Sequence, residues 1–475
     1  MDYSPAAVAN INRYGQRGRP SGYQASRQAR RHQSHQNPQS GWRTTVRAMS
    51  STVVASLYGK LSDIHGRRTM MLTAIGIFIA GSVICALAPS MLVLVLGRAL
   101  QGLGGGGIMP LAQVIVADVS APRDRGRYQA YLGAVWIGAG VGGPVVGGFI
   151  AQHLSWTLIF WINLPLGLAA AYLTNRSLKR LPRNDRWHEL DIVGAGLMML
   201  GAVSALLALT WGGTRYPWGS AQIVGLFVLA VLFALAFRWR IGVAHEPYLP
   251  LPILRNPVVR MGAASSACAM GVAIGLTVFV PFYYQLVHKL SVTNSGLALI
   301  PLALMTTPGA IMAGRAMMHL THYKRLTLVC VTLAMLATAF LAWQPQTSPW
   351  FVMVALALIG TGVGSVYPLS TVCIQNAVQP HEMGTATGVM NFFRALTASL
   401  AVAIMGAIML AGFGVAAGHG SGAEALMAAG VAGGDAANVF RWVFAAAAAF
   451  LAIGVVALVR LPERPLRGAS GKPAG

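Results

Sequence analysis

The sequence predicts an all-α polytopic membrane protein. Hydrophobic residues make up 55% of the 475-residue chain and charged residues only 10%, with a mean hydropathy of +0.59. Soluble domains carry about 25% charged residues, so a chain this long cannot cover itself with polar surface. Two further observations support this class: the number of bilayer-length apolar segments, and the distribution of Lys and Arg among the loops between them.

A helix needs about 20 apolar residues to cross the hydrocarbon core of a bilayer. A shorter apolar run, from about Met49 to Tyr58, has the character of the back half of one such helix. Twelve full-length spans are expected after it, at residues 70–88, 91–117, 129–151, 156–174, 191–213, 220–237, 261–286, 294–317, 326–343, 350–373, 386–412 and 439–459.

The basic residues test this topology. If the loop after Tyr58 is cytoplasmic, 22 of the 35 Lys and Arg fall on that side, and only Arg215, Lys289 and Arg441 fall on the other. This asymmetry is the positive-inside rule. The net charge of +23 is therefore explained by topology, and no nucleic-acid partner is expected. The rule places the C-terminus in the cytoplasm, and we expect a multi-pass protein of the inner (plasma) membrane.

The first 48 residues have a different composition. They hold eight Arg, no Lys, one acid and no apolar period, which is typical of disorder. Three readings stay open. In the first, the segment replaces a first helix and the start of a second through a frame error or a wrong start site. In the second, it is a native basic tail. In the third, it is an organelle-targeting peptide.

A charged motif follows the short apolar run. Residues 59–68 read Gly-Lys-Leu-Ser-Asp-Ile-His-Gly-Arg-Arg. A first glycine lets helices approach closely, and a second permits a tight turn. The run resembles the signature between helices two and three of the major facilitator superfamily, G-[RK]-x-[SA]-D-x-x-G-R-R. The resemblance implies a transporter whose acid pairs with a base and a second-half helix end, as a conformational latch made of Gly59, Lys60, Asp63, Gly66, Arg67 and Arg68.

Proton coupling is assigned to the next span. The sequence from Arg98 to Gly102, with Gln101 at its fourth position, resembles the family motif R-x-x-Q-G, whose arginine is tied to proton movement. A charge inside a span is a functional candidate by default, although Arg98 near the helix start could instead snorkel to the interface. The proton-coupling candidates are Arg98, Gln101 and Asp118.

The span at 129–151 is rich in glycine. Its core, Gly143-Pro144-Val145-Val146-Gly147-Gly148, resembles the family's antiporter motif G-P-x-x-G-G, which implies export by antiport. Small residues four apart allow close helix contact and proline bends a helix, although a generic packing helix would show the same pattern. The predicted hinge comprises Gly138, Gly142, Gly143, Pro144, Gly147 and Gly148.

The resemblance extends over residues 50–465 and favours the fourteen-helix drug:proton antiporter branch. It implies two six-helix halves and two central helices, with helix one and the start of helix two missing. The expected divisions are a tail at 1–48, an N-terminal half at 49–175, central helices at 189–240, a linker at 241–260, a C-terminal half at 261–460 and a cytoplasmic tail at 461–475.

The implied function is proton-coupled export of lipophilic or cationic drugs by alternating access. The alternatives are export of another metabolite and an inactive, truncated membrane protein, because the branch's usual acid in helix one is absent. No enzyme activity, metal or cofactor is expected, since the four cysteines lie far apart in apolar segments and the proton gradient would supply the energy. The partners are a small-molecule substrate, protons and the bilayer, and a monomer could suffice. Cavity candidates, which could equally be core or lipid-facing, are Trp136, Phe279, Tyr283, Tyr284, Asn391 and Arg394.

Overall fold

The structure is a computed structural model. It describes residues 57–121, 124–133, 135, 150, 155, 157–180, 191–213, 215–244, 248, 251–413 and 436–466, all within one compact unit that spans Thr45–Gly475. Eleven helices in these residues are long and apolar enough to cross a membrane. They confirm eleven of the twelve expected spans. The twelfth, at 129–151, lies largely outside the described residues.

The first group of helices follows a helical segment at residues 57–65. It comprises α4 (Arg67–Ala86), α5 (Met91–Val119), the single turn α7 (Leu158–Trp161), α8 (Asn163–Ser177) and the turn η1 (Leu178–Arg180). Helix α4 packs along α5 and α8. A Cβ atom on Gly104 of α5 would lie only 2.6 Å from the carbonyl oxygen of Ala74, so this helix pair depends on a residue without a side chain.

Two central helices come next. Helices α9 (Ile192–Trp211) and α10 (Ala221–Val243) pack against each other, and their first turns are capped by Asp191 and Ser220. Only Ile223 and Ile241 of α10 are buried. A helix that is apolar all round yet exposed in the folded chain is suited to face lipid.

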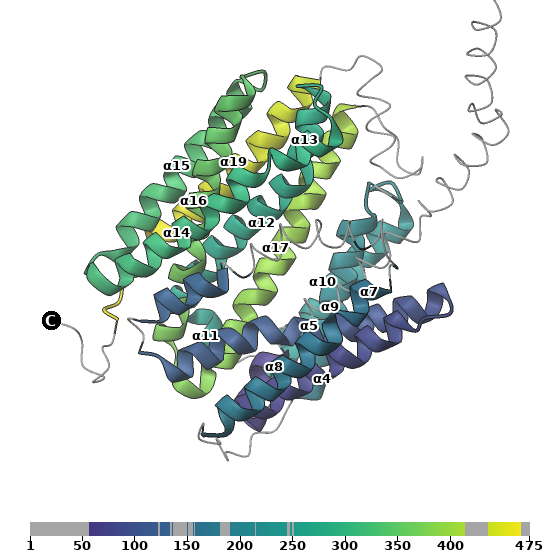
Figure 1. Cartoon of the computed structure of the whole chain (residues 1–475), viewed down its shortest axis with the longest axis vertical. Coiled ribbons are helices and arrows are strands. Elements are labelled where there is room, and N and C mark those ends of the chain that lie inside the picture. The colour runs from purple at the N-terminus through teal and green to yellow at the C-terminus, as the bar shows by residue number, and fades with distance from the viewer. Residues whose placement is uncertain are drawn as a thin grey trace, which may run out of the picture. The chain divides into compact units, whose positions relative to one another are not determined.

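The second group forms the larger core. Figure 1 shows its long helices bundled together, with α12 packing on α17 and α19, and α16 on α14 and α15. Its elements are α11 (Leu251–Arg255), α12 (Pro257–Leu286), α13 (Val292–Leu297), α14 (Ile300–His319), α15 (Tyr323–Trp343), α16 (Pro349–Ala377), η2 (Pro380–Glu382), α17 (Met383–Gly412) and α19 (Ala436–Arg460).

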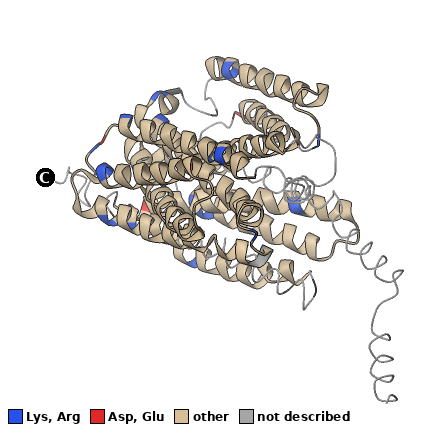
Figure 2. Cartoon of the chain, turned by 90° about the horizontal axis from the view of Figure 1, so that it is seen from above, with Lys and Arg blue, Asp and Glu red and all other residues tan. Residues whose placement is uncertain are grey.

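The helices extend beyond the apolar segments that predicted them. Helix α12 begins at Pro257 and α15 at Tyr323, so both take in basic residues that the sequence assigned to loops. Long cationic side chains at a helix end can reach polar surroundings while the backbone stays helical. Figure 2 shows how few Lys, Arg, Asp and Glu residues interrupt these helices.

The motif at residues 59–68 is also more helical than expected. Residues 57–65 are helical, and the chain turns at Gly66, whose φ of 87° lies in the left-handed region. Glycine adopts this conformation without the steric cost that a Cβ atom brings. The expected loop beginning at Lys60 was therefore wrong, and the expected tight turn at Gly66 is confirmed.

Candidate functional site: a polar seal between the two helix groups

The two helix groups meet where residues 57–65 approach the start of α17. A Cβ atom on Gly59 would overlap the carbonyl oxygen of Gly384, and one on Gly384 would lie 2.5 Å from the Asp63 carboxylate. Two glycines therefore allow backbone contact at this point, as predicted for Gly59. The neighbouring helix ends, near Arg67, Val119, His319, Ala377 and Met383, are called the latch face below.

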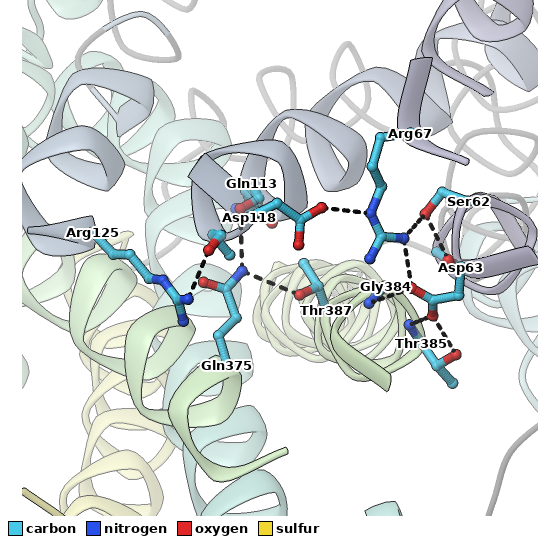
Figure 3. Close-up of polar contacts among 12 residues, drawn as sticks. Ser62, Asp63, Arg67, Gln113, Asp118, Arg125, Gln375, Gly384, Thr385 and Thr387 are labelled. Carbon is cyan, nitrogen blue, oxygen red and sulfur yellow. Dashed lines mark hydrogen bonds and ion pairs between the residues drawn. The ribbon is translucent and has the colours of Figure 1, made fainter. Parts of the chain in front are cut away.

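Asp63 makes the central contact of the latch face (Figure 3). Its carboxylate accepts hydrogen bonds from the backbone N–H of Gly384 at 3.2 Å, and from the N–H and hydroxyl of Thr385 at 2.9 and 3.0 Å. These N–H groups belong to the first turn of α17, where unpaired donors and the helix dipole favour an anion. Asp63 thus joins the first helix group to the N-terminus of a helix in the second.

Arg67 extends this contact into a network. Its Nη1 lies 2.5 Å from Asp63 Oδ1 and donates to Ser62 Oγ at 2.7 Å, while its Nε lies 2.8 Å from Asp118 Oδ2 at the end of α5. The Arg67 and Asp63 side chains are only 10% and 7% exposed. Burial raises the pKa of the Asp63 carboxyl, and the ion pair with Arg67 and the hydrogen bonds from Thr385 act against this rise.

The remaining motif residues lie around this network. Arg68 donates through Nε to Asn175 Oδ1 of α8 at 3.1 Å, which ties the motif to the first helix group. Lys60 is partly exposed. The structure therefore brings Asp63, Arg67 and the coupling candidate Asp118 together, and their transport roles remain predictions.

A second polar layer lies deeper between the helix groups. Gln113 of α5 donates to the Tyr367 hydroxyl, accepts from Asn391 Nδ2 at 2.8 Å, and offers its backbone carbonyl to Gln375 Nε2 at 3.3 Å. Gln375 also donates to Thr387 Oγ1 at 3.3 Å. These five residues are called the amide layer below. They join α5 to α16 and α17 through uncharged groups. Figure 3 shows Gln113, Gln375 and Thr387 of this layer.

Sequence reasoning singled out only Asn391 of this layer. The available signal was the presence of Gln113, Tyr367 and Gln375 inside otherwise apolar spans, since polar side chains there usually face protein. One sequence does not show how each helix is rotated about its own axis, so it does not show that these side chains converge.

Glycines make a third contact between the groups. A Cβ atom on Gly126 would lie 3.0 Å from the Cα of Gly314 in α14, and one on Gly133 would lie 3.8 Å from the Cβ of Ala310. Gly126 and Gly133 belong to the helical residues 125–133 that follow α5. The latch network, the amide layer and this glycine contact together seal the latch face.

The other coupling candidates lie within the first group. Arg98 donates to Gln101 Oε1 at 3.1 Å and lies over the Phe160 ring at 4.6 Å, and Gln101 donates to Ser82 Oγ at 2.7 Å. These contacts join α4, α5 and α7 near the end opposite the latch face. The structure does not bring Arg98 and Gln101 together with Asp118.

The predicted cavity residues are divided among three places. Phe279, Tyr283 and Tyr284 are buried in the core of the second group, where Tyr283 contacts the rings of Phe440 and Phe444. Asn391 belongs to the amide layer and Arg394 is buried on α17. Trp136 lies outside the described residues, as do the predicted hinge residues Gly138, Gly142, Gly143, Pro144, Gly147 and Gly148.

A cavity of about 420 Å³ lies between α12 and α17. The predicted cavity residues are not among its lining residues. Those are Leu254, Val259, Arg260, Ala263, Ala264, Ala267, Cys268, Val389, Phe393 and Thr397. Its walls are largely apolar, so it could accept a lipophilic group.

Comparison with known proteins identifies the family. The family model of the Major Facilitator Superfamily matches residues 30–190 and 192–402. The chain belongs to the major facilitator superfamily. Among relatives, this superfamily member is 32% identical to the multidrug transporter protein MdtP of Bacillus subtilis, over 78% of this chain and 68% of that protein. It is 34% identical to an uncharacterized transporter of Mycobacterium tuberculosis, over 78% of this chain and about half (54%) of the relative.

Solved structures show the same fold. The human organic anion transporter TETRAN matches with a TM-score of 0.59 at 16% identity, over 89% of this chain and 83% of that one. The proton:xylose symporter XylE matches with a TM-score of 0.56 at 15% identity, over 91% and 88%. These structures show the multi-pass fold, and the family match makes the chain a member of a superfamily that consists of transporters and not enzymes.

Proposed function

We propose that the chain exports lipophilic or cationic drugs across the cytoplasmic membrane in exchange for protons, by alternating access. The observation that carries the proposal is the seal at the latch face, which a carrier must close and open in turn. The similarity to the multidrug transporter protein MdtP supports drugs as the substrate class. In this proposal the latch face is cytoplasmic, in accord with the distribution of Lys and Arg.

The hydrogen bonds of the seal can be made in a closed state and replaced by bonds to water in an open state. Opening removes Asp63 from the first turn of α17 and separates Gln113 from Asn391 and Tyr367. Each buried hydrogen-bonding group left without a partner costs about 1–3 kcal/mol, but water entering on opening replaces those partners. The net difference between the states is thus small enough for substrate and proton binding to reverse it.

Asp63 is our candidate for linking protons to the seal. Its pKa is raised by burial in the closed seal and falls toward the ordinary value when opening exposes it. Proton binding therefore favours the closed seal, and this contribution is lost as the pH rises through the pKa of the buried carboxyl. Opening of the seal then releases a proton at the latch face, which is the direction that a drug:proton antiporter needs.

Transport in proteoliposomes tests the proposal. The full chain is reconstituted with an acidic lumen, and uptake of rhodamine B ethyl ester, a permanently charged lipophilic cation, is followed by fluorescence. We expect uptake that depends on the protein and stops when nigericin collapses the pH gradient. Uptake equal to that of protein-free liposomes, or unaffected by nigericin, would refute drug:proton exchange.

A further inference from the structure

Arg394 belongs neither to the latch network nor to any ion pair among the described residues. It lies in the third to fourth turn of α17, one helical turn beyond Asn391 of the amide layer, and is only 3% exposed. Arginine stays protonated in proteins. A buried charge in a membrane-spanning helix is costly and is retained where it serves a function.

The partners of Arg394 leave its charge uncompensated. Its Nη2 donates to Thr371 Oγ1 at 3.2 Å and to the Tyr367 carbonyl at 3.4 Å, and its guanidinium carbon lies 4.3 Å from the centre of the Tyr367 ring. Its Nε and Nη1 are buried and have no hydrogen-bond partner in the part of the chain that the structure describes. Two charged donor groups are thus held by neutral neighbours and lack an acceptor.

No acid in the described residues is placed to neutralise this charge. The ion pairs among these residues join other groups. The described acids lie in loops or in the end turns of helices, whereas Arg394 lies eleven residues into α17. They are Asp63, Asp118, Asp124, Asp191, Glu382 and Glu463.

Tyr367 connects Arg394 to the seal. Its hydroxyl accepts from Gln113 across the two helix groups, while its ring and carbonyl cover the guanidinium. Separation of the groups at the amide layer frees Tyr367 and so uncovers Arg394. Access to the charged donors is therefore coupled to opening of the seal.

We propose that Arg394 binds the anionic group of the transported compound, and that preferred substrates are lipophilic molecules bearing a carboxylate, zwitterions included. A carboxylate accepts charge-assisted hydrogen bonds from the two unused donors, while its apolar body meets the Tyr367 ring and neighbouring aliphatic side chains. A purely cationic compound gains none of these contacts. The proposal narrows the substrate class of the exporter described above, and its transport readout rests on that function.

A matched dye pair tests the site directly. Rhodamine B carries a free carboxylate, which its ethyl ester replaces with an uncharged ethyl ester group on the same ring system. Binding of each to the purified full-length chain is measured by fluorescence anisotropy. We expect the acid to bind about tenfold more tightly than the ester, which corresponds to about 1.4 kcal/mol, and Arg394→Gln to bring this ratio close to one through weaker binding of the acid.

Two further variants serve as controls for the dye-binding test. Arg325→Gln removes an exposed arginine of α15 and should leave the ratio unchanged. If Arg394→Gln does not fold, Arg394→Lys keeps the charge but lacks the planar donors, and we expect the ratio to fall at least threefold. An equal affinity of the wild-type chain for both dyes, or an undiminished ratio in either folded Arg394 variant, overturns the proposal.

Transport of the same dyes separates this inference from the proposed function. If the chain binds the acid selectively but carries neither dye, the anion site stands and drug export fails. If it carries both dyes at equal rates and binds them equally, export stands and the anion site is refuted.

Discussion

Asp63 forms both the ion pair and the hydrogen bonds that join the two helix groups at the latch face. It pairs with Arg67 on one side and accepts three hydrogen bonds from Gly384 and Thr385 on the other. Removing its charge takes away one of the two carboxylates that pair with the buried Arg67, the other being Asp118. Substitutions here should therefore change transport more than similar changes at exposed acids.

Asp63→Asn should lower the rate of rhodamine efflux from cells by about tenfold or more, because Asn cannot bind and release the proton proposed to link Asp63 to the seal, and Arg67 keeps only Asp118 of its two carboxylates. Efflux is compared at equal amounts of protein in the membrane. Asp124→Asn, at an exposed position of the next loop at the latch face, should be close to wild type. Equal efflux by both variants would remove Asp63 from the mechanism.

Gly384→Ala should impair efflux even though it adds only one methyl group. Its Cβ would lie 2.5 Å from Asp63 Oδ1, whereas a Cβ on Gly76 of α4 meets nothing within 4 Å. Gly76→Ala should leave efflux intact and slightly stabilise its helix. The same assay compares the two, and full activity of Gly384→Ala would mean that the groups do not approach this closely during transport.

Among the elements, the central helix pair is held by a single carboxylate. Asp191 caps α9 through the Gly194 N–H at 2.9 Å, pairs with Arg240 of α10 at 3.0 Å, and accepts from the Tyr248 N–H in the linker at 3.4 Å. Burial opposes ionisation, but these hydrogen bonds outweigh it and hold the pKa of Asp191 below its usual range. One residue thus connects both central helices to the chain that leads into α12.

Asp191→Asn should lower the melting temperature of the purified protein more than loss of a helix cap alone. Ser220→Ala, which removes only the cap of α10, supplies that comparison and should cost about 1 kcal/mol. We expect about twice that loss of stability for Asp191→Asn, since the ion pair with Arg240, whose side chain is 32% exposed, adds little more than a surface pair. A smaller loss for Asp191→Asn than for Ser220→Ala would contradict the assignment.

Gln113→Leu should weaken the amide layer, because Asn391 loses its acceptor on α5 and the Tyr367 hydroxyl loses its donor, while the backbone carbonyl that accepts from Gln375 remains. We expect the latch face to open more often, seen as faster alkylation of a cysteine introduced at Thr387. Gln222→Leu, at an exposed position of α10, is the matched control. Unchanged alkylation in Gln113→Leu would show that the layer does not hold the groups together.

For the molecule as a whole, sequence reasoning recovered the architecture more fully than the site. Span length and loop charge predicted the fold class and the eleven described spans, because both are set by the bilayer and by insertion rules. The motif at residues 59–68 pointed to Asp63 through its likeness to a family. Its hydrogen-bond donors Gly384 and Thr385 lie more than 300 residues away, a pairing that local sequence cannot indicate.

The aromatic residues show the limit of such reasoning. Phe279, Tyr283 and Tyr284 were plausible for a drug cavity because of their chemistry, yet they pack in the core of one helix group. A helix buried on several sides carries no periodic signal that separates core from cavity. The polar residues of the amide layer gave a better signal, since an uncharged amide within a span requires a partner.

The central claim is that the two helix groups separate at the latch face in every transport cycle. Gly133→Cys and Ala310→Cys would place two thiols where the Cβ atoms lie 3.8 Å apart, a separation typical of disulfides, in a background without Cys85, Cys268, Cys330 and Cys373. We predict that oxidation cross-links this pair and abolishes efflux, and that a reductant restores it. Undiminished efflux by the cross-linked protein would contradict the account.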